Sequence, residues 1–283
     1  MTIHKAYSSA TGALQNAMVP DPEQDAGLLL SHITGIPRLE LRLKGEQSLT
    51  LEQEQRFSSL LLSRTHREPL QYLLGEQCFY GLDFSVDQRV LIPRQETETL
   101  CELGIAHIKK LSTPAALDLC TGSGALAVTL KHECPPAQVT ATDLSADALA
   151  VAKQNAERNH AEIRFLQGDL FAPLGTERFD LILSNPPYIP SEECNVLQAE
   201  VMREPRMALD GGQDGLLFYR RMIAQATEHL TADGLLGMEV GERQASAVAE
   251  LLRSNGHYEQ VCIHKDLYGL ERVVTAHASD TPT

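Results

Sequence analysis

Apolar positions recur with helical spacing through the first part of the chain. Residues 25–33 carry apolar side chains three and four positions apart, as one buried face of a helix requires. Thr50 and Gln53 have the spacing of a capping box before a second apolar run, and a third short apolar segment follows at residues 72–75. We therefore predict a small helical domain over residues 1–77, which either recognises a partner or caps the rest of the protein structurally.

The pattern changes over residues 78–94, where aromatic and β-branched side chains alternate with turn residues. This composition is typical of a β-hairpin. We expect the hairpin to link the helical domain to the remainder of the chain.

Strand-like apolar runs alternate with helical patterns over residues 95–283. The expected strands are 115–119, 138–142, 163–166, 179–183 and 234–240, with a closing pair at 260–264 and 272–276, and the expected helices are 97–110, 125–132, 146–159, 215–230 and 244–255. Alternation of this kind implies an α/β fold, with a mostly parallel sheet of seven strands and helices on both faces.

The composition narrows the possible partners and compartments. The net charge of −14 disfavours general nucleic-acid binding, because affinity for phosphate backbones depends on Lys and Arg. No apolar stretch approaches the length of about 20 residues that spans a bilayer, and the amino terminus lacks the apolar core of a signal peptide. The six cysteines are scattered, as in proteins of a reducing compartment. We expect a cytoplasmic monomer with no metal, no membrane partner and no direct contact with nucleic acid.

A Gly-rich turn between the first predicted strand and helix of this sheet is a candidate cofactor loop. It fits the pattern G-x-G-x-x-A, and its candidate binding residues are Cys120, Thr121, Gly122, Ser123 and Gly124. Asp143 ends the next strand, where a carboxylate can accept hydrogen bonds from both ribose hydroxyls of a nucleotide cofactor; the alternative is a cap of the following helix. This much is compatible with either a nicotinamide cofactor or S-adenosylmethionine.

The loop after the third predicted strand carries Asp169 and Leu170. In such folds an acidic side chain here can accept a hydrogen bond from the adenine amino group, and an apolar neighbour can cover the ring. The alternative for Asp169 is an ordinary turn residue.

The segment Asn185-Pro186-Pro187-Tyr188 follows the fourth predicted strand, at the end where open α/β sheets bind ligands. The Asn185 side-chain oxygen and a backbone carbonyl at Pro186 can each accept an N–H of a planar amino or amide group, while Tyr188 lies against its flat face. The alternative is a Pro-rich turn. A methyltransferase needs such a site for its nucleophile, whereas a dehydrogenase needs a nicotinamide-orienting motif that the sequence lacks.

Together these motifs resemble the class I methyltransferases that act on planar nitrogens. Beyond them, the stretches EPLQYLLGE, VLIPRQETE, NPPYIP, EPRMALDGGQDGLLFYR and DLYGLERVV are similar to the protein-(glutamine-N5) methyltransferases of peptide chain release factors (the PrmC/HemK family). The likeness is strong from about residue 66 onward. Three positions depart from the usual pattern: Cys120 stands in place of glycine, Gln95 in place of proline and Leu170 in place of an aromatic residue.

The resemblance implies a Rossmann-like fold, S-adenosylmethionine as cofactor and, as substrate, the glutamine of the Gly-Gly-Gln motif in release factors, gripped in part by the helical domain. The chain's own Gly211-Gly212-Gln213 is interpreted as a coincidental turn. Three alternatives stay open: methylation of a ribosomal-protein glutamine, methylation of amino groups on DNA or RNA bases, and a non-catalytic adaptor that binds the cofactor.

Overall fold

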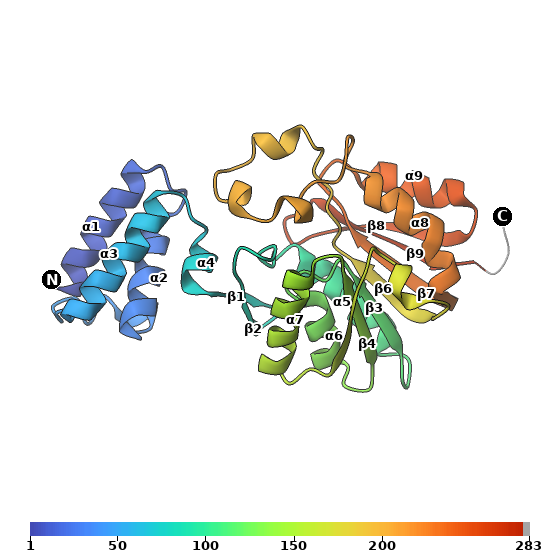
Figure 1. Cartoon of the computed structure of the whole chain (residues 1–283), viewed down its shortest axis with the longest axis horizontal. Coiled ribbons are helices and arrows are strands. Elements are labelled where there is room, and N and C mark those ends of the chain that lie inside the picture. The colour runs from blue at the N-terminus through green and yellow to red at the C-terminus, as the bar shows by residue number, and fades with distance from the viewer. Residues whose placement is uncertain (280–283) are drawn as a thin grey trace. The chain divides into compact units, whose positions relative to one another are not determined.

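The computed structural model describes residues 1–279 (Figure 1). The chain forms two compact units. One contains residues 1–75 together with 198–203, and the other contains residues 76–197 and the described residues from 204 onward.

The first unit is a helical bundle, as predicted. Its helices are α1 (Ile3–Asn16), α2 (Pro22–Thr34), α3 (Leu51–Thr65) and α4 (Leu70–Leu74). The capping box that begins α3 is confirmed, since the Thr50 hydroxyl accepts from Gln53 N and the Gln53 side chain accepts from Thr50 N. The α1 helix was not predicted from the pattern; it buries Ile3, Ala6, Ala10 and Leu14 in the core of the bundle.

Ion pairs explain why a short segment distant in sequence belongs to this unit. The Arg64 guanidinium is buried and pairs with Asp25 at 2.7 Å and with Glu200 at 2.8 Å. Arg67 donates to both oxygens of Glu200 at 2.6 Å. A bidentate Arg–carboxylate pair fixes geometry as well as charge, so residues 198–203 are attached to the helical bundle through Glu200.

The second unit begins with a hairpin of β1 (Glu76–Phe79) and β2 (Leu82–Ser85). Its strands end earlier than the sequence pattern predicted, and residues 86–93 contain no strand. The reason is local: the Asp87 carboxylate accepts from Arg89 N at 3.0 Å, and the Asp87 carbonyl accepts from Val90 N at 3.1 Å. Such side-chain-to-backbone bonds favour a turn over continued pairing.

The remainder of this unit is the predicted α/β sheet. Its strands are β3 (Ala115–Leu119), β4 (Gln138–Asp143), β5 (Ile163–Gln167), β6 (Phe179–Ser184), β7 (Leu230–Glu239), β8 (Tyr258–Lys265) and β9 (Glu271–Ala278), in the order β5-β4-β3-β6-β7-β9-β8. The helices are α5 (Thr97–Ile108), α6 (Ala125–Glu133), α7 (Ala146–Arg158), α8 (Leu217–His229) and α9 (Ala245–Asn255). The pairing confirms a mostly parallel seven-stranded sheet, since β9 alone runs in the direction opposite to the other six strands.

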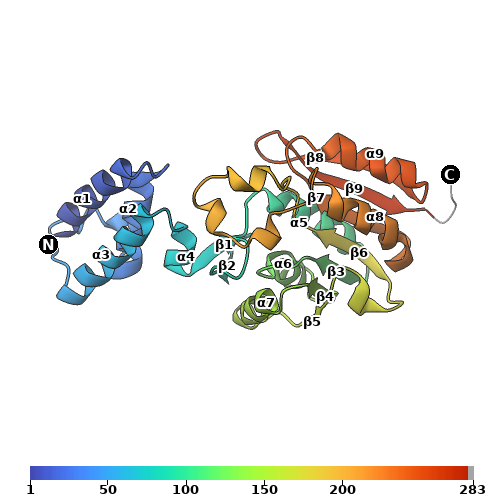
Figure 2. The ribbon, with the colours of Figure 1, turned by 45° about the horizontal axis from the view of Figure 1, so that its top comes forward.

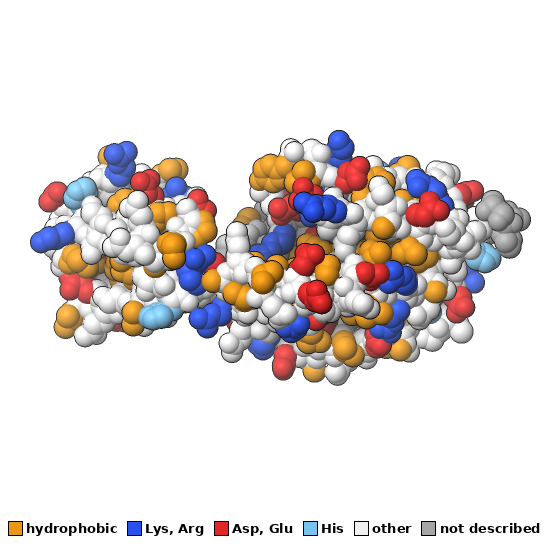
Figure 3. Space-filling model, turned by 90° about the horizontal axis from the view of Figure 1, so that it is seen from above, with side chains coloured by type: hydrophobic (Ala, Val, Ile, Leu, Met, Phe, Trp, Pro, Cys, Tyr) orange, Lys and Arg blue, Asp and Glu red, His pale blue; other side chains and the backbone are white. Residues whose placement is uncertain are grey.

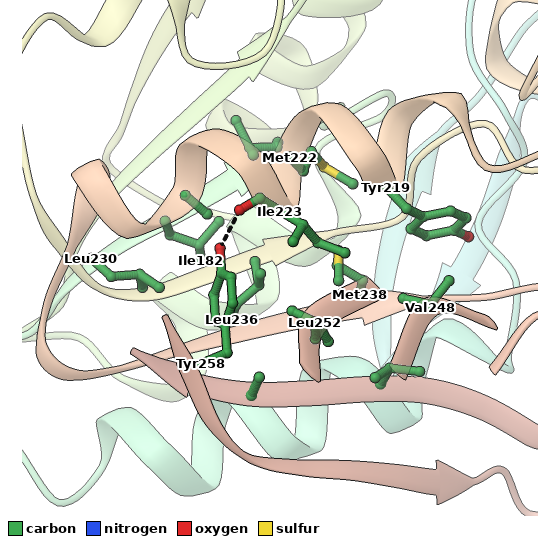
Figure 4. Packing of buried hydrophobic residues seen from close by; sticks show 14 of the residues in the cluster. Ile182, Tyr219, Met222, Ile223, Leu230, Leu236, Met238, Val248, Leu252 and Tyr258 are labelled. Carbon is green, nitrogen blue, oxygen red and sulfur yellow. Dashed lines mark hydrogen bonds between the residues drawn. The ribbon is translucent and has the colours of Figure 1, made fainter. Parts of the chain in front are cut away.

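Alternating residues of each strand supply the two hydrophobic cores, as a pleated sheet requires. Leu181 and Leu183 of β6 belong to the core under α5 and α6, whereas Ile182 belongs to the core under α8 and α9. Figures 1 and 2 show these helices as layers on opposite faces of the sheet. In the core under α8 and α9, the Tyr258 hydroxyl donates to the Ile223 carbonyl at 2.7 Å (Figure 4). The polar end of this buried ring therefore has a hydrogen-bond partner.

The strand order creates a topological switch point beside β3. The chain passes from β3 to β4 and β5 on one side and then to β6 and β7 on the other. Loops at the carboxyl ends of β3 and β6 therefore diverge, and ligands of open α/β sheets bind in the crevice that results.

Candidate functional site

A cavity opens at this edge of the sheet, with an empty volume of about 1030 Å³ that includes its solvent-open part. Predicted site residues that line it are Cys120, Thr121, Gly122, Ser123, Asp143, Asp169, Leu170, Asn185 and Pro187. The cavity thus joins the candidate cofactor residues to the first residue of the Asn-Pro-Pro-Tyr segment. Gly124, Pro186 and Tyr188 stand outside this lining set.

The Gly-rich loop after β3 has three residues in the left-handed backbone region: Cys120 at φ 60°, Gly122 at φ 56° and Gly124 at φ 83°. A Cβ on Gly122 would meet no atom within 4 Å, so conformation rather than crowding requires glycine there. A Cβ on Gly124 would lie 3.2 Å from Ala152 Cβ. Gly124 therefore serves the close packing of α6 on α7.

Asp143 points its carboxylate into this loop. One oxygen accepts from Gly122 N at 2.9 Å and the other from Ser145 N at 2.8 Å. Burial raises the pKa of Asp143, and these backbone hydrogen bonds oppose the rise. The cap of α7 is Ser145, whose hydroxyl accepts from Ala148 N at 3.1 Å, so Asp143 keeps its place in the cavity wall and is not the helix cap.

Asp169 and Leu170 lie in the same wall. Asp169 pairs with Arg221 of α8 at 2.7 Å, and both side chains are more than a third exposed. Exposed pairs of this kind contribute little to stability. Leu170 is buried and adopts φ 51°, which directs the chain sharply after β5. Arg221 was not predicted from the sequence, because no motif marks a partner that arrives from a distant helix.

Asn185 is oriented by a contact that sequence analysis missed. Its Nδ2 donates to Thr97 Oγ1 at 3.1 Å. Thr97 is the first residue of α5 and is 5% exposed. Among the described residues no group bonds to Asn185 Oδ1, so this oxygen remains available to a ligand in the cavity.

The backbone around Tyr188 is closely packed. The Tyr188 carbonyl accepts from Gln244 Nε2 at 2.8 Å, and a Cβ on Gly211 would lie 2.7 Å from Tyr188 Cα. The Tyr188 ring packs beside the core under α8 and α9, and burial, together with the charge of Glu239, raises the pKa of its hydroxyl. Gly211 therefore has a structural role against this segment.

A second missed contact holds the irregular segment that follows the hairpin. The Glu204 carboxylate is buried, accepts from Ile92 N at 3.0 Å and pairs with Arg94. Arg94 and Pro93 both line the cavity. Glu204 thus orders one wall of the site.

Residues 1–279 contain no cluster of three or more His, Cys, Asp or Glu side chains that could hold a metal ion. None of their helices is both long enough and apolar enough to cross a membrane.

Comparison with known proteins identifies the family. Residues 99–218 match the family model of the methyltransferase small domain, and residues 5–75 match that of the PrmC N-terminal domain. A release factor glutamine methyltransferase of Geobacter sulfurreducens is 41% identical over 96% of this chain and 95% of its own. A release factor glutamine methyltransferase of Deinococcus radiodurans is 40% identical over 98% of this chain and 98% of its own.

A solved structure supports the fold independently. The catalytic domain of hMettl16, in complex with an RNA hairpin of the MAT2A 3′UTR, superposes with a TM-score of 0.57 at 18% identity, covering 83% of this chain and 84% of that one. At this level of identity the likeness concerns the fold alone. With relatives of about 40% identity that span nearly its whole length, the chain belongs to the family of release factor glutamine methyltransferases, which are S-adenosylmethionine-dependent enzymes.

Proposed function

We propose that this protein transfers a methyl group from S-adenosylmethionine to the side-chain amide nitrogen of the glutamine in the Gly-Gly-Gln motif of class I peptide chain release factors, and thereby modulates translation termination. The observation that carries the proposal is the Asn185 amide. It lies in the wall of one cavity with the Gly-rich loop and Asp143, and its Nδ2 is held by Thr97 while its Oδ1 is available.

The described residues fit the cofactor. The backbone at Gly122 leaves open space where a side chain would stand, and the Asp143 carboxylate lines the cavity with lone pairs beyond its two backbone bonds. Asp143 would hold the ribose hydroxyls, residues 120–124 would lie along the rest of the nucleoside, and Asp169 with Leu170 would contact the adenine. When bound, S-adenosylmethionine supplies a methyl group on a positively charged sulfur.

The task of the protein's own residues follows from the weakness of the nucleophile. An amide nitrogen has a delocalised lone pair, so it must be positioned and its developing positive charge must be stabilised. Its N–H groups become stronger donors as it gains the methyl group. Acceptors at Asn185 Oδ1 and the Pro186 carbonyl would therefore bind the transition state more tightly than the ground state, with Tyr188 against the face of the amide. The surplus proton leaves to water after transfer.

Release factors are favoured over nucleic acid by charge. The net charge is −14, and on the face drawn in Figure 3 basic side chains are interspersed with acidic ones over most of the surface. A duplex or single strand binds to surfaces where Lys and Arg dominate. A ribosomal-protein glutamine presents the same chemistry at the reacting atoms, and it is the second candidate substrate.

The test is mass spectrometry of a purified release factor after incubation with this protein and S-adenosylmethionine. One added methyl group on the Gly-Gly-Gln glutamine, absent from a factor with that glutamine changed to Ala, is the expected result. Asn185→Ala should lower the rate by about 10²–10³-fold, as loss of one oxyanion-hole donor does elsewhere. An unmodified factor, with cofactor binding intact, would refute the proposal and redirect the search to ribosomal proteins.

A further inference from the structure

A buried polar chain leads from Asn185 to the end of β7. The Thr97 hydroxyl accepts from Asn185 Nδ2 at 3.1 Å and lies against the Glu239 carboxyl, where it favours the ionised form and lowers the pKa. Glu239 is 1% exposed, and its Oε2 has no partner among the described residues. A buried carboxyl with an unsatisfied oxygen is costly, so a structural role alone gives no reason to retain it.

The chain has a direction because a hydroxyl carries a single proton. When Glu239 is ionised, it can only accept, and the proton of Thr97 points to it. The Thr97 oxygen then has only lone pairs to offer to Asn185. The Asn185 amide must turn its Nδ2 toward Thr97, which leaves Oδ1 on the other side. When Glu239 is protonated, it can donate to Thr97, whose own proton can then turn to Asn185 and favour the flipped amide.

Several charged and titratable groups face Glu239. Burial raises the pKa of Glu239 to about 7; the Thr97 hydroxyl and the charges of Arg272 and Arg94 oppose this rise, while Glu96 adds to it. Tyr188 faces the same carboxyl, and the hydroxyl of Tyr219 donates to the backbone carbonyl of Glu239 at 2.8 Å. The carboxyl therefore changes its charge near neutral pH.

We propose that Thr97 and Glu239 are positioning residues that fix the orientation of the Asn185 amide, so that its oxygen rather than its NH₂ faces the nitrogen to be methylated. The proposal rests on the function proposed above, since it assumes an acceptor that presents N–H groups to Asn185. It assigns a role to two residues that do not belong to the Asn-Pro-Pro-Tyr segment.

The kinetic test uses matched threonine variants. Thr97→Val removes the hydroxyl at nearly constant shape and should lower kcat by about 10–100-fold, the effect of one hydrogen bond to a charged group, with KM for the release factor and the Kd of S-adenosylmethionine changed less than about threefold. Thr97→Ser keeps the hydroxyl and should restore most of the rate. The control is Thr129→Val in α6, where the buried hydroxyl has no partner, and it should retain wild-type kcat.

The pH profile distinguishes orientation from packing. In the wild-type protein kcat should rise as pH passes through about 7, when Glu239 ionises. Thr97→Val and Glu239→Gln should lose this step, because neither retains the proton-dependent chain. Equal kcat for Thr97→Val and wild type, or a Thr97→Ser variant as slow as Thr97→Val, would overturn the proposal.

A measurement without substrate separates this inference from the proposed function. The side-chain NH₂ signals of Asn185, assigned by their loss in Asn185→Ala, can be followed by ¹⁵N NMR against pH. They should titrate with a midpoint of about 7 in the wild type and Thr97→Ser, and not in Thr97→Val. If the wild type fails to methylate release factors but this titration is seen, the substrate is wrong and the positioning role stands. Signals that do not respond to pH or to Thr97→Val refute it.

Discussion

Asp118 tests how strongly burial destabilises a charged carboxylate beside the Gly-rich loop. It is the residue before the last of β3, is fully buried, and accepts through Oδ2 from the Thr121 hydroxyl at 2.6 Å and from Ala127 N at 3.2 Å. Its Oδ1 has no partner among the described residues. Burial raises the pKa of Asp118 to about 7, against the lowering effect of these two hydrogen bonds, and the charge of Asp143 adds to the rise.

The sign of the effect on stability follows from proton binding. Between pH 3.8, the ordinary pKa, and about pH 7, the folded carboxyl keeps a proton that the unfolded chain has released. The free energy of unfolding therefore falls as pH rises through this window and levels above it. A pKa difference of this size between the folded and the unfolded chain changes the free energy of unfolding by at most about 4 kcal/mol. Asp118→Asn imitates the protonated form at every pH, so it should equal wild type near pH 4 and be more stable by up to about 4 kcal/mol at pH 8.

Urea unfolding followed by circular dichroism between pH 4.5 and 8.5 measures this difference. The chain has no tryptophan, so backbone ellipticity is the natural signal, and the transition to follow is that of the unit containing β3. Asp83→Asn, whose side chain is 64% exposed, is the control for the chemical change itself. Glu239 titrates in both proteins, so only the difference between them is diagnostic. A difference that stays constant with pH would refute the reasoning.

Three further changes test other parts of the structure. Asp143→Asn should weaken S-adenosylmethionine binding by about 10–100-fold in calorimetry, because a charged acceptor is lost; unchanged affinity would exclude Asp143 from the ribose site. Gly211→Ala puts a Cβ 2.7 Å from Tyr188 Cα, so single-turnover methylation should slow while cofactor affinity holds, and a normal rate would contradict this. Glu200→Gln removes the carboxylate that pairs with both Arg64 and Arg67 and should cost the helical unit about 3 kcal/mol at pH 7 in urea unfolding. Burial opposes ionisation of Glu200, but hydrogen bonds, first of all that from Arg67, lower its pKa to about 2. The loss of stability in Glu200→Gln should therefore persist down to pH 4.5 and shrink only at lower pH. A variant as stable as wild type at pH 4.5 would argue against the ion pair.

The strands and helices of the sheet were predictable because each carries its own pattern. The run at 115–119 coincides with β3, and the helix expected at 125–132 differs from α6 by one residue. The hairpin was predicted too long because β-branched residues continue past Ser85, whereas the turn at Asp87 is made by a side chain that bonds to the backbone. Composition does not distinguish a polar residue within a strand from one whose side chain bonds to the backbone and makes a turn.

The positioning residues were not predictable, since their role exists only in the packed molecule. Thr97 had the pattern of an ordinary helix start, and Glu239 that of a polar residue ending an apolar strand. Packing of α5 over β6 and β7 places both beside Asn185. Buried carboxyl groups are unusual, so a glutamate in an apolar strand suggests a special role for Glu239. The sequence does not show that Glu239 acts together with Thr97.

The cysteine at position 120 shows how a departure from a family pattern is understood once the backbone is known. Cysteine is a small residue, but the relevant quantity at position 120 is its φ of 60°, which costs a non-glycine residue about 1 kcal/mol. Glycine would avoid this cost but lose about 0.5–1 kcal/mol through its greater freedom in the unfolded chain, so the two residues nearly balance. The thiol adds no competing chemistry: burial raises its pKa to about 12 against a weaker opposing effect of Ser184, and a protonated thiol is a poor nucleophile toward a methyl donor. Cysteine is therefore compatible with this loop for reasons of backbone energy and protonation rather than size.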